Sequence, residues 1–227
     1  MTSDNCEMKR RSGRQKILDF FFFPLRAVTL FHEDCWGLSC LASERFDYVA
    51  REVRGYCLDV GCGRHNRFLR EYRGGDGHGI DVFAYEGLGM ENIVPDLTHL
   101  PFADATFGSV TFIANLNHCP EPDRDAELRE SWRVLKPGGN IILTMGHPVA
   151  EILVHKLVWV YDKVCNTNYD MDNERGMHED EDYYLLDREI LDRLGRAGFE
   201  KVRKKHFLTQ WGLNHLFVGW KPGMPPK

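Results

Sequence analysis

Leu58-Asp59-Val60-Gly61-Cys62-Gly63 has the pattern of a short buried strand that runs directly into a glycine-containing turn. A helical stretch is predicted after it, over about residues 67–72. In an open parallel sheet, ligands bind outside the carboxyl ends of the strands, and the first strand–helix turn lies there. Glycines in such a turn let the backbone approach a ligand closely, and the following helix offers unpaired N–H groups. The turn is therefore the first candidate ligand site.

The segments around this turn alternate between strand and helix patterns. Further strands are predicted near 78–82, 93–94, 108–113 and 141–145, and helices over 43–54, 123–136 and 187–197. Ser43 is the expected N-cap of the first helix, and Pro137-Gly138-Gly139 is expected to form a tight turn. Two final strands, 201–208 and 213–220, are close in sequence and indicate an antiparallel hairpin at one edge.

Several of these strands are apolar on both faces, which is typical of a parallel sheet covered by helices on both sides. The predicted fold class is α/β: a single-domain, Rossmann-like, doubly wound sheet in three αβα layers. The sheet is expected to be mostly parallel, with the C-terminal hairpin as its antiparallel edge.

Composition limits the classes of protein that remain. The chain has 227 residues, 43% hydrophobic and 28% charged, which suits one α/β domain and excludes a disordered or collagen-like chain. A net charge of −5 provides no general basic field, so nucleic acid is not an expected partner. Seven cysteines without CxxC spacing indicate reduced thiols and a cytoplasmic location. The acidic run 178–182 is interpreted as a solvated loop, so no metal site is predicted.

The position of Asp81 indicates that the expected ligand contains a nucleoside. It ends the second predicted strand eighteen residues after Gly63, where a carboxylate can accept hydrogen bonds from ribose hydroxyls. A dinucleotide would favour a third glycine, but that position is Asn66. Asp59 suits a ligand with positive charge, such as an amino group or a sulfonium, better than a pyrophosphate.

Five blocks between residues 57 and 145 carry a family resemblance. They are the 58–63 turn, Asp81, the run from Asp96-Leu97 through Leu100-Pro101-Phe102 to Phe107, Asn115-Leu116-Asn117-His118-Cys119, and Arg133-Val134-Leu135-Lys136-Pro137-Gly138-Gly139. In order and spacing this region resembles the class I S-adenosylmethionine-dependent methyltransferases. In particular, it resembles the type-11 branch, which includes ubiquinone- and menaquinone-biosynthesis enzymes.

The resemblance implies S-adenosylmethionine as the cofactor and assigns it seven residues: Asp59, Gly61, Gly63, Asp81, Asp96, Leu97 and Asn115. The two glycines would border the methionine part, with Asp59 near its amino group. Asp81 would hold the ribose, Asp96 would receive the adenine amino group, and Leu97 would line the adenine slot. Asn115 would face the sulfonium region.

One departure from the family concerns the turn itself. His65 stands where the family usually has a further glycine, and Arg64-His65-Asn66 carries one extra residue. This departure supports one alternative, a non-catalytic module that binds S-adenosylmethionine. The other alternative is a nicotinamide-dependent reductase on a similar fold, against which the missing glycine and the later blocks argue.

Two histidines are candidates for catalysis. His118 follows the fourth predicted strand and His147 follows the fifth, so either side chain could reach an acceptor as a general base or a positioning group. The alternative interpretation is a histidine that packs at the end of a strand. No GxSxG or other nucleophile motif is present.

The segments before and after the cofactor-binding region are expected to determine which acceptor binds. Residues 1–42 are interpreted as an N-terminal cap or lid and 43–227 as the methyltransferase domain, with a cofactor half at 56–146 and an acceptor-side insertion at 147–186. Within the insertion, 149–164 is apolar and helix-like, which favours a small-molecule or lipid-like acceptor. The basic and then aromatic run 9–25 either packs on the domain or makes peripheral contact with a membrane.

Overall fold

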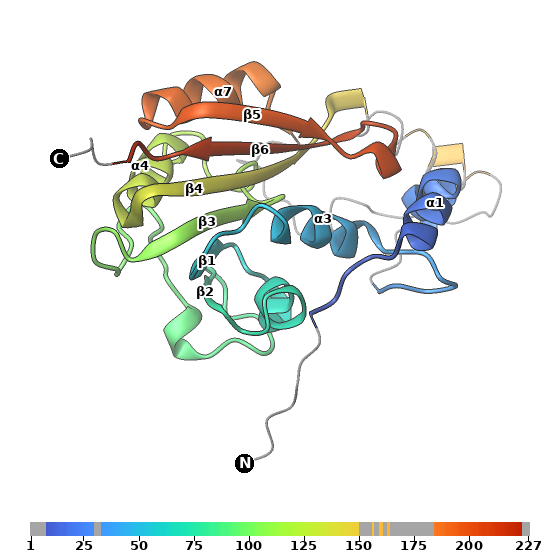
Figure 1. Ribbon diagram of the computed structural model, residues 1–227, viewed down its shortest axis with the longest axis horizontal. Helices are drawn as coiled ribbons and strands as arrows, with labels where there is room; N and C mark the ends of the chain where they lie inside the picture. Colours follow the sequence, from blue (N-terminus) through green and yellow to red (C-terminus); the bar gives the residue numbers. More distant parts are fainter. Residues whose placement is uncertain are drawn as a thin grey trace, which may run out of the picture.

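The computed structural model describes residues 8–29, 33–149, 156, 159–160, 163 and 184–223. These residues form a six-stranded sheet in the order β2-β1-β3-β4-β6-β5, with helices on both sides (Figure 1). The strands are β1 Cys57–Val60, β2 Gly77–Ile80, β3 Phe107–Ile113, β4 Leu135–Gly146, β5 Glu200–His206 and β6 Asn214–Trp220. The predicted α/β fold is confirmed.

The sheet has a parallel part and an antiparallel edge. Strands β2, β1, β3 and β4 pair in parallel, with Val60 opposite both Ile80 and Phe112. Strand β6 is antiparallel to β5, as predicted from the short connection between them, and it is also antiparallel to β4. Because parallel strands end at the same edge, the loops after β1, β2, β3 and β4 meet there.

Two layers of helices cover the sheet. Helices α4 (Arg124–Val134) and α7 (Asp187–Arg196) pack on one face, where Leu128 and Ile190 join a core with the strand residues Leu58 and Ile141. On the other face, α3 (Leu41–Ala50) and the π-helical turn η2 (Phe68–Tyr72) cover Ile142 and Val218. Helices α1 (Gly13–Phe21) and α2 (Phe23–Thr29) precede α3.

Three local predictions were wrong. The strand predicted at 93–94 is only an isolated bridge between Asp81 and Ile93, because the 3₁₀ turn η3 (Met90–Asn92) occupies the chain just before it. Helix α3 begins at Leu41 with Cys40, not Ser43, as its N-cap; the Cys40 Sγ accepts the Ser43 N–H at 3.2 Å. The separate tight turn predicted at 137–139 is instead part of β4, at the point where the pairing of β4 with β3 shifts register.

Parts of the insertion lie outside the described residues. Most of the apolar segment predicted at 149–164 and all of the acidic run 178–182 belong to these parts. Among the described residues, no helix has both the length and the apolar character that crossing a bilayer requires.

Candidate functional site

The turn after β1 is anchored to the end of β2. The backbone N–H groups of Gly61 and Cys62 both donate to the Ile80 carbonyl oxygen, at 2.8 and 3.0 Å. Gly61 and Gly63 both have positive φ, +72° and +63°, which glycine adopts without the steric cost that other residues meet. The predicted glycine turn is therefore a tight connection at the edge where the parallel strands end.

Asp81 closes this turn from the neighbouring strand. Its Oδ2 accepts the Gly63 N–H at 3.0 Å and its Oδ1 accepts the Phe83 N–H at 3.1 Å, while the side chain is buried. Each carboxylate oxygen has two lone pairs, so both can still accept a further hydrogen bond. The geometry thus holds a carboxylate beside the glycine turn with capacity to accept further hydrogen bonds.

Asn115 brings the end of β3 to the same turn. A Cβ built on Gly61 would lie 2.2 Å from the Asn115 Cγ, far inside van der Waals contact. The amide side chain therefore occupies the space that any other residue at position 61 would need. Gly61, Gly63, Asp81 and Asn115 are brought together as expected from the sequence.

Asp59 is buried beneath the turn. The Thr111 hydroxyl donates to its Oδ1 at 2.6 Å, across the register that pairs these residues of β1 and β3. Burial, together with the charge of Asp81, raises the pKa of Asp59 to about 7. A carboxyl with this pKa is partly neutral at physiological pH and becomes an anion readily when a cationic group comes close.

The 64–66 segment keeps a tight path without glycine. His65 and Asn66 have φ values of +60° and +47°, in the left-handed region where glycine is most easily accommodated. The His65 N–H donates to the Glu86 carbonyl oxygen at 2.8 Å, and its ring covers Gly87, where a Cβ would lie 2.4 Å from the His65 Nδ1. Contacts with the segment after β2 thus compensate for the backbone strain.

Asp96 and Leu97 occupy different surroundings. Leu97 is buried in the core that covers one face of the sheet. The Asp96 carboxylate is exposed and accepts hydrogen bonds from the Thr98 N–H and hydroxyl, and it contacts the ring of His99 at 3.0 Å. These bonds from Thr98 and His99 lower the pKa of Asp96, so the carboxylate is an anion held within its own turn.

His118 follows β3 in the turn that begins at Asn115. Its N–H donates to the Asn115 carbonyl oxygen at 2.9 Å, so the two residues share one turn at the edge of the site. Cys119, the next residue, donates from Sγ to Glu127 of α4 at 2.8 Å, and burial raises the pKa of Glu127 to about 7.

His147 lies in a cluster that the sequence did not indicate. Its ring is 5.2 Å from the ring of His215, which is itself 4.5 Å from the ring of His206. The Nδ1 of His215 lies 2.9 Å from the Asp187 Oδ1, yet burial lowers the pKa of His215 overall. The Nδ1 of His147 accepts the Val149 N–H at 3.1 Å, so a neutral His147 ring carries its proton on Nε2.

Thr111 and His215 are residues that sequence reasoning missed. Both pair directly with residues on neighbouring strands: Thr111 with Asp59 and His215 with Met145. The strand pattern was visible in the sequence, but the register that sets these partners is not determined by the pattern alone. No group of three or more His, Cys, Asp or Glu side chains suited to a metal ion occurs among the described residues.

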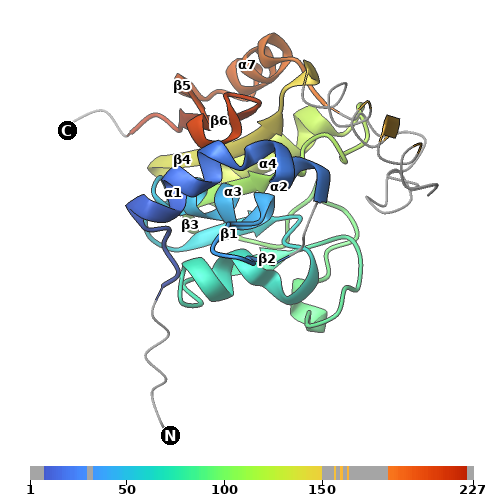
Figure 2. The ribbon, with the colours of Figure 1, turned by 90° about the vertical axis from the view of Figure 1, so that its right-hand side faces the viewer.

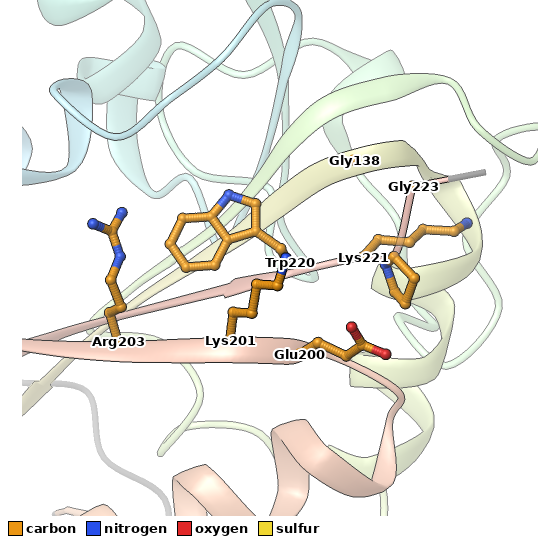
Figure 3. Close-up of a pocket in the computed structure, with 8 residues that line it drawn as sticks. Gly138, Glu200, Lys201, Arg203, Trp220, Lys221 and Gly223 are labelled. Atoms are coloured by element: carbon orange, nitrogen blue, oxygen red, sulfur yellow. The ribbon is translucent and has the colours of Figure 1, made fainter. Parts of the chain in front are cut away.

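A separate hollow lies at the other end of the sheet (Figure 3). It has a volume of about 610 Å³ and is lined by Gly138, Glu200, Lys201, Arg203, Trp220, Lys221, Pro222 and Gly223. Trp220 pairs with Asn140 near the start of β4, far along the strand from Gly146, where the parallel strands end. Arg203 lies over the Trp220 ring at 4.6 Å, and Lys221 Nζ donates to the carbonyl oxygens of Trp132 and Leu135, so these cations already have partners.

Comparisons with known proteins indicate a methyltransferase domain. Residues 58–143 match a family model described as a methyltransferase domain. A ubiquinone/menaquinone biosynthesis C-methyltransferase from Desulfotalea psychrophila is 38% identical over 77 residues, which is 34% of this chain and 30% of that protein. The chain spans between 30% and about half of the length of such relatives.

Solved structures share the fold at low identity. An S-adenosylmethionine-dependent methyltransferase from Methanosarcina mazei superposes with a TM-score of 0.54 at 20% identity, over 78% of this chain and 97% of that one. The [4+2]-cyclase SpnF superposes with a TM-score of 0.54 at 17% identity, over 96% and 98% of the two chains. Since these two proteins carry different names for their activities, the structural likeness shows the fold alone.

Proposed function

Since residues 58–143 form a methyltransferase domain of the type-11 branch of class I S-adenosylmethionine-dependent methyltransferases, we propose that this chain transfers a methyl group to a small-molecule acceptor. The family's cofactor is S-adenosylmethionine, a nucleoside with a cationic amino group and a sulfonium. The turn after β1 supports its binding here.

The observation that carries the proposal is the packing of Asn115 on Gly61 beside the Gly63–Asp81 hydrogen bond. It places backbone without side chains next to a buried carboxylate with free lone pairs, which fits a ribose. Asp59, buried and with a pKa near 7, fits a cationic amino group because the positive charge would stabilise its ionised form. The residues present therefore fit the cofactor.

The remaining cofactor residues are proposed from the resemblance. Asp96 receives the adenine amino group with its exposed carboxylate, and buried Leu97 gives one wall of the adenine slot. Asp81 holds the ribose, while Gly61, Gly63 and Asn115 border the methionine part. When bound, S-adenosylmethionine supplies an electrophilic methyl group, and the electrons of the broken C–S bond remain on sulfur.

The chain's own contribution is binding, alignment and the exclusion of water. An in-line displacement needs no covalent group from the protein, because holding the two reactants in line supplies much of the rate. An acceptor that must lose a proton needs a base, and we assign this role to His118, which shares a turn with Asn115. His147 presents Nε2–H when neutral, which suits a hydrogen-bond donor that orients the acceptor.

The acceptor we propose is a hydrophobic small molecule or a lipid-like one. The relatives named for ubiquinone and menaquinone biosynthesis support a small acceptor. The apolar sequence of 149–164 favours a hydrophobic one.

Calorimetric titration with S-adenosylmethionine is the first test. Wild-type protein should bind it, and Asp81→Ala should weaken binding at least tenfold, because it removes the carboxylate proposed to hold the ribose; charged-group hydrogen bonds of this kind contribute roughly 1.5–3 kcal/mol. Affinity in Asp81→Ala equal to wild type would overturn the site assignment. Thermal-shift measurements with NADH and NADPH in parallel test the reductase alternative, which predicts stabilisation by a nicotinamide instead.

Transfer is tested separately with methyl-labelled S-adenosylmethionine and a metabolite and lipid extract. A labelled acceptor product supports the proposal and identifies the substrate. Cofactor binding without any labelled product would favour the non-catalytic module.

A further inference from the structure

Seven large apolar side chains are exposed on α1, on α2, on the turn η4 (Leu208–Gln210) and on the residues that directly follow α1 and η4. This aromatic patch consists of Ile17, Phe20, Phe21, Phe22, Leu25, Leu208 and Trp211. Phe21 is 69% exposed and Leu208 is 72% exposed. Apolar side chains scattered singly over a surface need no explanation, but a contiguous group of this size marks an interaction site.

Contacts between distant parts of the sequence join the aromatic side of α1 and α2 to Trp211. The Trp211 Nε1–H donates to the Phe20 carbonyl oxygen at 2.9 Å, and the Trp211 ring lies 5.4 Å from the ring of buried Phe23. The Phe20 and Phe21 rings meet edge to face at 5.4 Å. Trp211 has φ +51°, so the turn that presents its ring adopts a conformation uncommon for a bulky residue.

The charge beside the patch has one sign. Between residues 8 and 29 the only carboxylate is Asp19, which is fully buried and accepts hydrogen bonds from Arg11 and Ser39. Arg10 and Arg14 are exposed and Lys16 is half-buried, and none of the three has an ion-pair partner among the described residues. On a chain of net charge −5, the exposed part of this segment therefore carries basic and apolar side chains and no carboxylate.

The segment that carries the patch is fixed to the domain. Arg11 forms ion pairs with Asp19 and Glu44 and a further one with Asp47 of α3, all with buried side chains. Arg26 is fully buried and donates to the Ser39 carbonyl oxygen at 2.7 Å. These interactions use the polar side of α1 and α2, so the aromatic side is left facing outward.

The patch lies near the edge where the parallel strands end. Asn214, at the start of β6, pairs with Gly146 at the end of β4, so the β5–β6 connection with η4 and Trp211 is at that edge. Helix α1 contacts η4 there and lies at the right of the sheet in Figure 1. Figure 2, viewed from that side, shows α1 and α2 in front of the strands.

We propose that the aromatic patch and the basic residues Arg10, Arg14 and Lys16 dock the protein on the surface of an anionic lipid bilayer. Aromatic and aliphatic side chains beside Lys and Arg, with no exposed carboxylate between residues 8 and 29, match an interface of acyl chains and negative headgroups. A protein partner with an apolar groove would not by itself explain the one-sided charge. Docking through this edge would present the methyl-transfer site to molecules held in the bilayer.

Co-sedimentation of the full chain with vesicles tests the proposal without cofactor or turnover. We expect binding to vesicles of phosphatidylcholine with 30% phosphatidylglycerol, little binding to pure phosphatidylcholine, and weakening as salt is raised. Two variants should each reduce the partition coefficient between vesicles and water about tenfold or more. One carries both Ile17→Glu and Phe21→Glu, and the other carries Arg14→Glu alone. Since no cofactor is present, a negative result leaves the proposed methyl transfer standing, and a failed transfer assay leaves the docking standing.

Matched controls separate the patch from general effects of charge. Met90→Glu adds a carboxylate at an exposed apolar side chain of η3, and Lys136→Glu reverses a basic residue at the opposite end of β4. Both should bind anionic vesicles within about twofold of wild type. Equal binding by wild type and all patch variants would overturn the proposal. So would a wild-type dimer in light scattering that Phe21→Glu dissociates, because it would assign the patch to self-association.

Discussion

The Asn115 side chain lies where a Cβ of residue 61 would have to be, 2.2 Å from its Cγ, so any side chain at position 61 requires Asn115 to move. Gly61 also has φ +72°. Two independent constraints, one conformational and one steric, thus act on the same position. They link the end of β3 to the glycine turn in a way that a strand-and-turn pattern alone does not show.

Gly61→Ala should therefore damage the site more than a simple loss of glycine. We expect affinity for S-adenosylmethionine to fall at least tenfold, because Asn115 must move, and stability to fall by about 1–2 kcal/mol from the left-handed backbone. Calorimetric titration and urea unfolding measure the two effects.

Gly55→Ala is the matched control for that prediction. Gly55 has φ +61° and no atom within 4 Å of a built Cβ, so the substitution carries the backbone cost without the clash. It should lower stability by a similar amount, roughly 1 kcal/mol, and leave cofactor affinity unchanged. If Gly61→Ala binds the cofactor as well as Gly55→Ala does, the contact with Asn115 has no role in shaping the site.

Asp59→Asn should stabilise the protein increasingly between about pH 4 and pH 7. Burial raises the pKa of Asp59 from 3.8 to about 7, so across this range the unfolded chain releases a proton that the folded chain retains. Folding stability attributable to Asp59 is complete below the unfolded pKa and is lost as pH rises toward 7, with a total on the order of 4 kcal/mol. Asparagine does not titrate, and its Oδ1 can still accept the Thr111 hydroxyl.

Urea unfolding of both proteins at pH 5, 6, 7 and 8 isolates this effect. The pKa of Glu127 is also raised to about 7, so Glu127 makes the unfolding free energy depend on pH equally in both proteins. Its contribution therefore cancels in the difference between them. If the unfolding free energies of wild type and Asp59→Asn changed with pH in parallel, the raised pKa of Asp59 would be contradicted. The same substitution should weaken binding of S-adenosylmethionine, since it removes the anion proposed to face the amino group, so stability and function would change in opposite directions.

The sequence was informative where one local pattern determines one local structure. The glycine turn, the position of Asp81 after β2 and the C-terminal hairpin were predicted from short runs and are confirmed. The strand expected at Ile93-Val94 was wrong because β-branched residues there have no partner strand beyond the single bridge to Asp81.

Other features depend on contacts between residues that are far apart in the sequence. The Arg11–Asp47 ion pair joins residues 36 positions apart, and the Asp59–Thr111 and Met145–His215 pairs follow from strand register. A register cannot be read from alternation alone when both faces of a strand are buried. The boundaries at residues 42 and 146 and the roles of His118 and His147 remain predictions.

Arg11→Met should destabilise the protein strongly although methionine fills similar space. Arg11 is buried among Asp19, Glu44 and Asp47, and its removal leaves three buried carboxylates with fewer cations. Breaking a buried ion pair from one side costs about 3–5 kcal/mol. Its neighbour Arg10 is exposed, so Arg10→Met should change stability by no more than about 0.5 kcal/mol.

Urea unfolding and limited trypsin digestion of the two variants check this contrast. Loss of the buried pairs should also loosen α1 and speed cleavage after Arg14 and Lys16 in Arg11→Met, whereas Arg10→Met should be cleaved there at the wild-type rate. Equal unfolding free energies and equal digestion rates in the two variants would show that the buried cluster does not hold the N-terminal segment.

His147→Asn and His147→Ala together distinguish an anchoring role from a chemical one. The His147 Nδ1 accepts the Val149 N–H, a bond that an asparagine oxygen can replace and alanine cannot, so Ala should be less stable than Asn by about 1 kcal/mol.

If the ring orients the acceptor through Nε2–H, both variants should raise KM for the acceptor about tenfold and leave the pH profile of kcat unchanged. Full activity in His147→Asn would show that the ring only anchors the backbone and does not orient the acceptor. Loss of the acidic limb of the pH profile would instead make His147 a general base, with its proton on Nδ1 and the bond from Val149 broken during turnover.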